Sequence, residues 1–212
     1  MSIDTAWQTE VSAYQDNTVA HHSRVQRFVA EVNKTPWLKT HRDYVERHGY
    51  GFGERAFHYM WKLLVLQLPN NFRFLEVGVY KGQVLSLVDY AARMYDMEGR
   101  VYGVTMLSDF SGVTGKFPKF PKGDYLQHIR NLHEHFDQPM PYLIVGDSTS
   151  PATVAAAQYQ APYDIVYIDG CHEYSYVRLD LMHYAPMVKP GGFLVVDDAS
   201  CYLKMYPGAF SG

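Results

Sequence analysis

The chain has 212 residues, of which 47% are hydrophobic and 19% are charged, a balance typical of a globular protein with a buried core. Its formal net charge is −3, so it lacks the basic excess expected of a nucleic-acid-binding protein. The N-terminus has no signal-peptide pattern, and no apolar run reaches the roughly 18 residues that a membrane helix needs. Two cysteines, Cys171 and Cys201, suit a reducing compartment, so we expect a cytoplasmic protein without membrane or nucleic-acid partners.

The first part of the chain is expected to be helical. Apolar residues recur at helical spacing before Pro36, at Val25, Phe28, Val29 and Val32. We interpret residues 1–52 as an N-terminal helical extension or cap. Segment 53–69 has apolar residues at i, i+3, i+4, i+7 and i+8, which predicts an amphipathic helix. We place the start of the main domain, 53–212, at this helix.

From residue 72 onward, short apolar runs alternate with helical patterns. The runs predict strands at 72–78, 100–106, 141–147, 163–169 and 191–198. The patterns between them predict helices at 83–95, 124–136, 150–159 and 174–188. Such alternation forms parallel β-α-β units, so the expected fold class is α/β, with a doubly wound, mostly parallel, Rossmann-like sheet. The connection 107–123 is long for an ordinary loop, and we predict a lid or recognition loop there.

Acidic residues occur at the ends of four of the five predicted strands. They are Glu76, Asp147, Asp169, Asp197 and Asp198. Because the carboxyl ends of parallel strands meet at one edge of the sheet, where ligands bind, these residues predict a site at that edge.

The turn after the first strand reads "LEVGVYKGQVL". Gly78 permits a tight turn and the close approach of a ligand, and Gly82 opens a helix whose N–H groups can receive an anion. Tyr80 stands where the dinucleotide fingerprint G-x-G-x-x-G requires glycine. The pattern therefore disfavours a pyrophosphate cradle and, with it, a nicotinamide oxidoreductase.

Together with "GDS" at 146–148 and "KPGGFLVVDD" at 189–198, this turn makes residues 72–200 resemble the class I S-adenosylmethionine-dependent methyltransferases. Within them, the chain is similar to the branch of metal-dependent macrolide sugar O-methyltransferases and cephalosporin hydroxylase-like proteins. The resemblance implies S-adenosylmethionine as cofactor, with its methionine end in the first turn and its adenine beside the third strand. The cofactor-binding residues that it implies are Glu76, Gly78, Tyr80, Gly82, Thr105, Asp147, Ser148 and Asp169. Thr105 stands where the family usually has a ribose-binding acid, and Asp109 is the alternative.

The metal-dependent branch has an Asp after the fourth strand, a His three residues later, and an acidic pair after the fifth. Asp169, His172 and the pair Asp197–Asp198 match this pattern. Independently of the resemblance, carboxylates on neighbouring strands converge and repel one another unless a cation neutralises them. Oxygen ligands suit Mg²⁺, or Mn²⁺ or Ca²⁺, better than zinc. We predict Asp169, Asp197 and Asp198 as metal ligands, although one of the last two can instead cap a helix.

The chemistry of methyl transfer explains this combination. A sulfonium methyl is already activated, so the demanding step is deprotonation of the acceptor hydroxyl. A metal ion that chelates two neighbouring hydroxyls lowers the pKa of one of them, and His172 then takes the proton as general base. We therefore predict O-methylation of a small hydroxylated substrate, a sugar or a polyhydroxylated natural product.

Two other functions remain open from the sequence. The first is a metal-independent small-molecule methyltransferase, and the second is a non-catalytic cofactor-binding module. Self-association into a homo-oligomer is also left open. A class I methyltransferase normally carries a helix and two antiparallel strands after the fifth strand, whereas this chain stops 14 residues after Asp198. We therefore expect a longer native protein, with the C-terminal antiparallel strands missing here.

Overall fold

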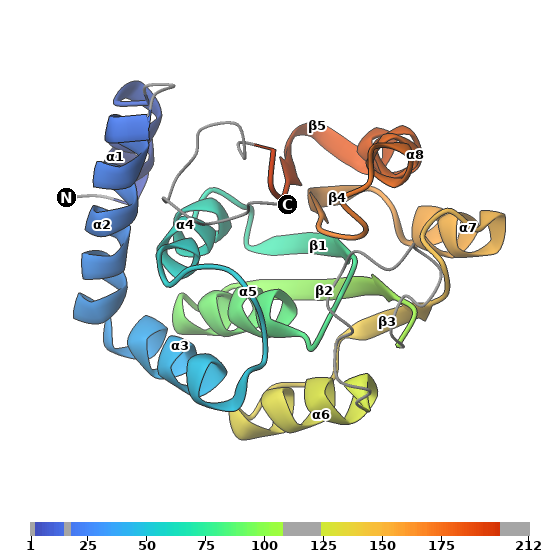
Figure 1. Ribbon diagram of the computed structural model, residues 1–212, viewed down its shortest axis with the longest axis horizontal. Helices are drawn as coiled ribbons and strands as arrows, with labels where there is room; N and C mark the ends of the chain where they lie inside the picture. The colour runs from blue at the N-terminus through green and yellow to red at the C-terminus, as the bar shows by residue number, and fades with distance from the viewer. Residues whose placement is uncertain (1–2, 15–17, 108–123, 200–212) are drawn as a thin grey trace. The chain divides into compact units, whose positions relative to one another are not determined.

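The computed structural model describes residues 3–14, 18–107 and 124–199 (Figure 1). These residues fall into two compact units, one numbered up to 68 together with 198 and 199, the other 69–197. The domain boundary that we place between residues 52 and 53 stays a prediction. The expected lid at 107–123 lies, apart from Leu107, outside the described residues. None of the described helices is long and apolar enough to cross a membrane.

The first unit is helical, as its sequence predicts. Its helices are α1 (Ile3–Ser12), α2 (Thr18–Lys34), α3 (Pro36–His48) and α4 (Ala56–Val65). Helix α4 is shorter than the segment 53–69 that periodicity predicts, since Gly53 has a left-handed backbone (φ +83°) and the chain turns after Val65. Between α3 and α4, the buried side chains of His41 and His58 share a hydrogen bond of 2.9 Å.

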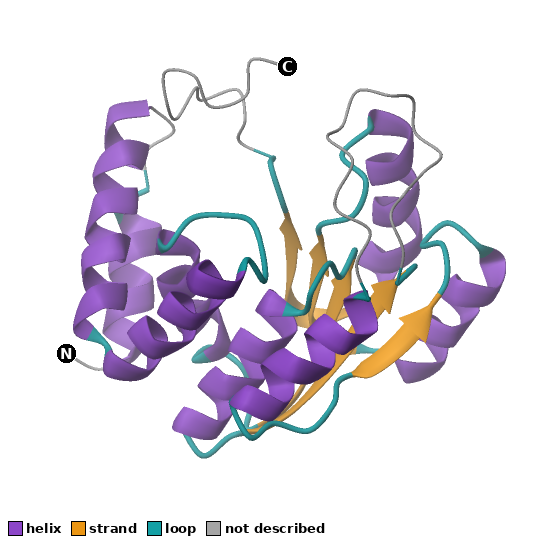
Figure 2. Cartoon of the chain, turned by 60° about the horizontal axis from the view of Figure 1, so that its bottom comes forward, coloured by secondary structure: helices purple, strands orange, loops and turns teal. Residues whose placement is uncertain are grey.

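The second unit is an α/β sandwich, which confirms the expected fold class. Its strands are β1 (Asn71–Val77), β2 (Glu98–Thr105), β3 (Tyr142–Val145), β4 (Tyr163–Ile168) and β5 (Val188–Val196). Its helices are α5 (Gln83–Met94), α6 (Tyr125–His135), α7 (Pro151–Gln160) and α8 (Tyr174–Tyr184), and a short 3-10 helix spans Ala185–Met187. The strands are all parallel, in the order β3-β2-β1-β4-β5, and their arrows point to one edge in Figure 2.

Helices cover both faces of this sheet. On one face, Val77, Val104 and Ile168 pack in a core with Ala157 of α7 and Tyr184 of α8. On the other face α5 lies so close that a side chain at Gly103 would clash with Leu85. Burial on both faces explains why the strands read as continuous apolar runs.

The strand order reverses between β1 and β4, and there the backbone of Gly78 lies against the loop that follows β4. A methyl group on Gly78 would lie 2.3 Å from the carbonyl oxygen of Asp169 and 2.5 Å from Cα of Gly170. The N–H of Asp169 donates to the carbonyl of Val77 (2.8 Å), so the two chains are joined at this point. The glycine is therefore required by the packing of the chain itself, whatever ligand approaches it.

Replacing Gly78 with Ala should destabilise the protein much more than Gly191→Ala. Both glycines have left-handed backbones (φ +105° and +80°), but no atom lies within 4 Å of a methyl group on Gly191. Gly191→Ala should therefore lower the free energy of unfolding by only about 1–2 kcal/mol, the cost of holding a residue other than glycine in a left-handed backbone. Gly78→Ala adds a clash with backbone atoms, and we expect a further loss of about 2 kcal/mol or more. Urea unfolding of both variants measures the difference, and equal losses would show that the contact is not tight.

Candidate functional site

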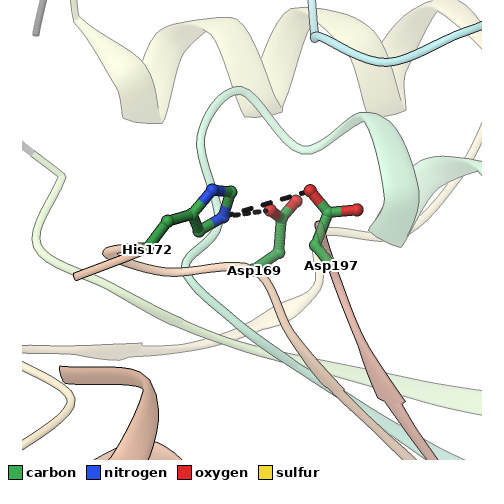
Figure 3. Close-up of side chains that lie close together, drawn as sticks. All are labelled: Asp169, His172 and Asp197. Carbon is green, nitrogen blue, oxygen red and sulfur yellow. Dashed lines mark hydrogen bonds and ion pairs between the residues drawn. The ribbon is translucent and has the colours of Figure 1, made fainter. Parts of the chain in front are cut away.

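Three side chains gather beyond the carboxyl ends of β4 and β5 (Figure 3). Nε2 of His172 lies 3.4 Å from Oδ1 of Asp169 and 4.0 Å from Oδ2 of Asp197. Backbone hydrogen bonds continue past the strand ends and bring the two acids together, because the N–H of Asp197 donates to the carbonyl of Ile168 (2.9 Å). The sequence predicts all three residues for this site, and the fold places them side by side.

The group is open enough for a ligand to reach it. The side chains of Asp169, His172 and Asp197 are 29%, 38% and 25% exposed. One ligand atom from each lies within 4.8 Å of the others, which is compatible with a shared metal ion. Within the described residues this group does not include Asp198, whose backbone is left-handed (φ +54°), and its role as a ligand stays a prediction.

Glu76 is buried in β1, on the same edge of the sheet. Its side chain accepts a hydrogen bond from the N–H of Leu85, but Oε2 has no hydrogen-bond partner among the described residues. Burial raises the pKa of Glu76 well above its usual value, and the negative charges of Asp169 and Asp197 raise it further. Such an orphaned oxygen can accept a hydrogen bond from a donor on the methionine end of a bound cofactor.

The other residues of the first turn lie between this edge and α6. Gly82 precedes α5 with a left-handed backbone (φ +83°), and a methyl group there would lie 3.2 Å from Ile129. The Tyr80 ring lies 5.3 Å from the ring of Tyr125 and 5.0 Å from Nζ of Lys81. Their contacts with a cofactor stay predictions.

Three further predicted cofactor residues already hold the turns of this edge. The buried Thr105 hydroxyl donates to the carbonyl of Val79 (2.9 Å) and accepts from the N–H of Leu107 (3.1 Å). Oδ1 of Asp147 accepts from the N–H (2.8 Å) and hydroxyl (2.7 Å) of Thr149. The carbonyl of Ser148 accepts from the hydroxyl of Tyr184 (2.7 Å). Cofactor contacts of these residues also stay predictions, and Asp109 lies outside the described residues.

Tyr167 is a further residue of this edge that was not among those predicted from the sequence; it lies in β4, two residues before Asp169. Its side chain is buried and its hydroxyl is hydrogen-bonded to Asp169. The sequence does carry an indication of this: a tyrosine interrupts the aliphatic run "IVYI" two residues before Asp169, so the two side chains lie on the same face of the extended chain.

Comparison with known proteins identifies the family of the second unit. A family described as a methyltransferase domain matches residues 75–199, more than half of the chain. Demethylmacrocin O-methyltransferase from Streptomyces fradiae is 38% identical over 76 residues, which are 35% of this chain and 18% of that protein. This chain therefore matches less than a fifth of the length of that relative.

Two of the solved structures that share the fold show how far the likeness extends. One is a TDP-rhamnose 3'-O-methyltransferase of calicheamicin biosynthesis (TM-score 0.51, 17% identity, 88% of this chain and 81% of the other). The second is a candidate caffeoyl-CoA O-methyltransferase from Staphylococcus aureus (TM-score 0.52, 16% identity, 75% of this chain and 65% of the other). At these identities the likeness is one of fold.

Glu76→Gln should stabilise the cofactor-free protein increasingly as the pH rises. The pKa of Glu76 in the folded state lies above its ordinary value of 4.5, so above that pH the unfolded chain releases a proton that the folded chain retains. Stability therefore falls as the pH rises from 4.5 towards the folded-state pKa, by at most about 1.4 kcal/mol per pH unit. Gln lacks this titration. Urea unfolding between pH 5 and 8 measures the difference in unfolding free energy between Glu76→Gln and wild type. A difference that does not change with pH would contradict the raised pKa of Glu76. Glu98→Gln, at an exposed position, is the control.

Proposed function

Because this chain belongs to the methyltransferase-domain family, we propose that it is an S-adenosylmethionine-dependent O-methyltransferase with a divalent metal ion in its active site. Its substrate is a hydroxyl group of a sugar or a polyhydroxylated natural product. The observation that carries this proposal is the convergence of Asp169, His172 and Asp197 at the edge where such sheets bind ligands. The names of the relatives support the acceptor, since one O-methylates demethylmacrocin and another the 3'-hydroxyl of TDP-rhamnose.

The donor set suits a hard cation. Asp169 and Asp197 offer carboxylate oxygens, which Mg²⁺, Mn²⁺ and Ca²⁺ prefer, and the cluster holds no thiolate. Asp198 is a further candidate ligand. When bound, S-adenosylmethionine supplies an electrophilic methyl group and the metal ion lowers the pKa of a chelated hydroxyl. Glu76 and the first turn would hold the methionine end of the cofactor, and Asp147 and Ser148 would bind beside its adenine.

His172 is the general base in this proposal. Its Nε2 takes the proton of the acceptor hydroxyl, and the negative charge of Asp169, whose Oδ1 lies 3.4 Å from the same nitrogen, stabilises the imidazolium that forms. The same nitrogen is also close enough to both acids to serve as a third metal ligand. A nitrogen that ligates a metal cannot accept the proton, so the two roles are exclusive and experimentally separable.

Calorimetric titration tests the cofactor and metal sites separately. S-adenosylhomocysteine should bind in EDTA, and Mg²⁺ should bind the wild-type protein. Asp197→Asn should weaken Mg²⁺ binding at least tenfold and leave S-adenosylhomocysteine binding intact, because it removes one charged ligand. Asp137→Asn, at a fully exposed position, should change neither affinity. A protein that binds no S-adenosylhomocysteine in either condition would contradict the methyltransferase proposal for this chain.

His172→Ala distinguishes the base from the ligand. As a general base, its loss should lower methyl transfer to a panel of nucleotide sugars and glycosylated macrolides by about 10²–10⁴-fold while the Mg²⁺ affinity stays unchanged. As a ligand, its loss should lower the Mg²⁺ affinity instead. His135→Ala, at an exposed histidine of α6, is the control.

Turnover in EDTA equal to that in Mg²⁺ would favour a metal-independent methyltransferase. Cofactor binding without transfer to any acceptor in the panel would favour a non-catalytic module.

A further inference from the structure

Tyr167 lies among three carboxylates on one face of the sheet. The parallel register pairs it with Glu76 of β1 on one side and with Val195 of β5 on the other. Asp169 and Asp197 follow two residues after Tyr167 and Val195 and therefore share its face. The tyrosine thus shares one face of the sheet with all three acids.

The hydroxyl of Tyr167 is a hydrogen-bond donor to the Asp169 side chain. The tyrosine is only 5% exposed, and the bond joins its hydroxyl to the carboxylate. An ionised carboxylate can only accept, so the phenol is the donor in this bond.

A second buried tyrosine in the same strand shows what a purely structural hydroxyl does. Tyr163 donates to the backbone carbonyl of Ala157 in α7 (2.8 Å) and so ties the strand to a helix. Tyr167 directs its hydroxyl to a side chain of the candidate site instead. Phenylalanine would fill the volume of either ring, so packing alone does not require a phenol at position 167.

We infer that Tyr167 is a positioning residue, whose hydroxyl fixes the Asp169 carboxylate in the orientation that faces His172 and Asp197. The inference rests on the proposed function, because the preorganised group is the proposed metal site. A carboxylate held by a buried donor loses little rotamer freedom when it binds a cation, and the cation therefore binds more tightly. Without the hydroxyl, Asp169 can turn away, and the metal ion must restore its orientation on binding.

Tyr167→Phe should weaken Mg²⁺ binding by about tenfold in calorimetry, the lower end of the effect of losing a hydrogen bond to a metal ligand. The affinity for S-adenosylhomocysteine in EDTA should not change. Tyr163→Phe, the matched control, loses a buried hydroxyl from the same strand. It should leave the Mg²⁺ affinity within about twofold of wild type, because substitutions at sites that do not interact affect one another only to about that extent. Urea unfolding of both variants checks that each is folded.

The Mg²⁺ dependence of turnover gives a second test, because a residue with a purely structural role would not change it. In Tyr167→Phe the Mg²⁺ concentration for half-maximal activity should rise, while kcat at saturating Mg²⁺ returns close to that of wild type. An unchanged Mg²⁺ affinity in Tyr167→Phe, alongside a loss in Asp197→Asn, would overturn the positioning role and leave the metal site standing. Absence of Mg²⁺ binding by the wild-type protein would instead overturn the metal site itself, and the inference with it.

Discussion

The backbone of Gly78 touches the backbone of Asp169 and Gly170, and no side chain fits between them. This contact joins the ends of β1 and β4 at the point where the strand order reverses. It also fixes the position of Asp169 relative to the turn that follows β1. The residue that holds the proposed metal and the loop that holds the proposed cofactor are therefore positioned by one steric constraint.

Electrostatics distinguish this edge of the sheet from the opposite one. Near the amino ends of the strands, the buried carboxylate of Asp164 is neutralised by Nζ of Lys189 at 2.8 and 2.9 Å. At the carboxyl edge, Nε2 of His172 lies 3.4 Å from Oδ1 of Asp169 and 4.0 Å from Oδ2 of Asp197. The acids of neighbouring strands gather at the edge where parallel sheets bind ligands, which is why we interpret this edge as a binding site.

Several residues at this edge hold turns as well as serving as candidates for ligand contact. Thr105 joins the first turn to the end of β2, and Asp147 closes the turn that precedes α7. Such bonds restrain the loops that would surround a cofactor, so the two roles are compatible. Substituting these residues would disturb the loop and the ligand together, whereas Tyr167 and Asp197 allow substitutions that conserve shape.

The sequence by itself determined the order and type of the elements and the edge of the sheet where the acids gather. Both are local properties, because a strand and a helix differ in the period of their apolar residues, and parallel strands present their carboxyl ends together. Only the tertiary structure showed that Asp197 comes within reach of Asp169 and His172, and that Tyr167 is hydrogen-bonded to Asp169. Those outcomes depend on the register between strands far apart in the chain, and a shift of one residue turns every side chain to the other face.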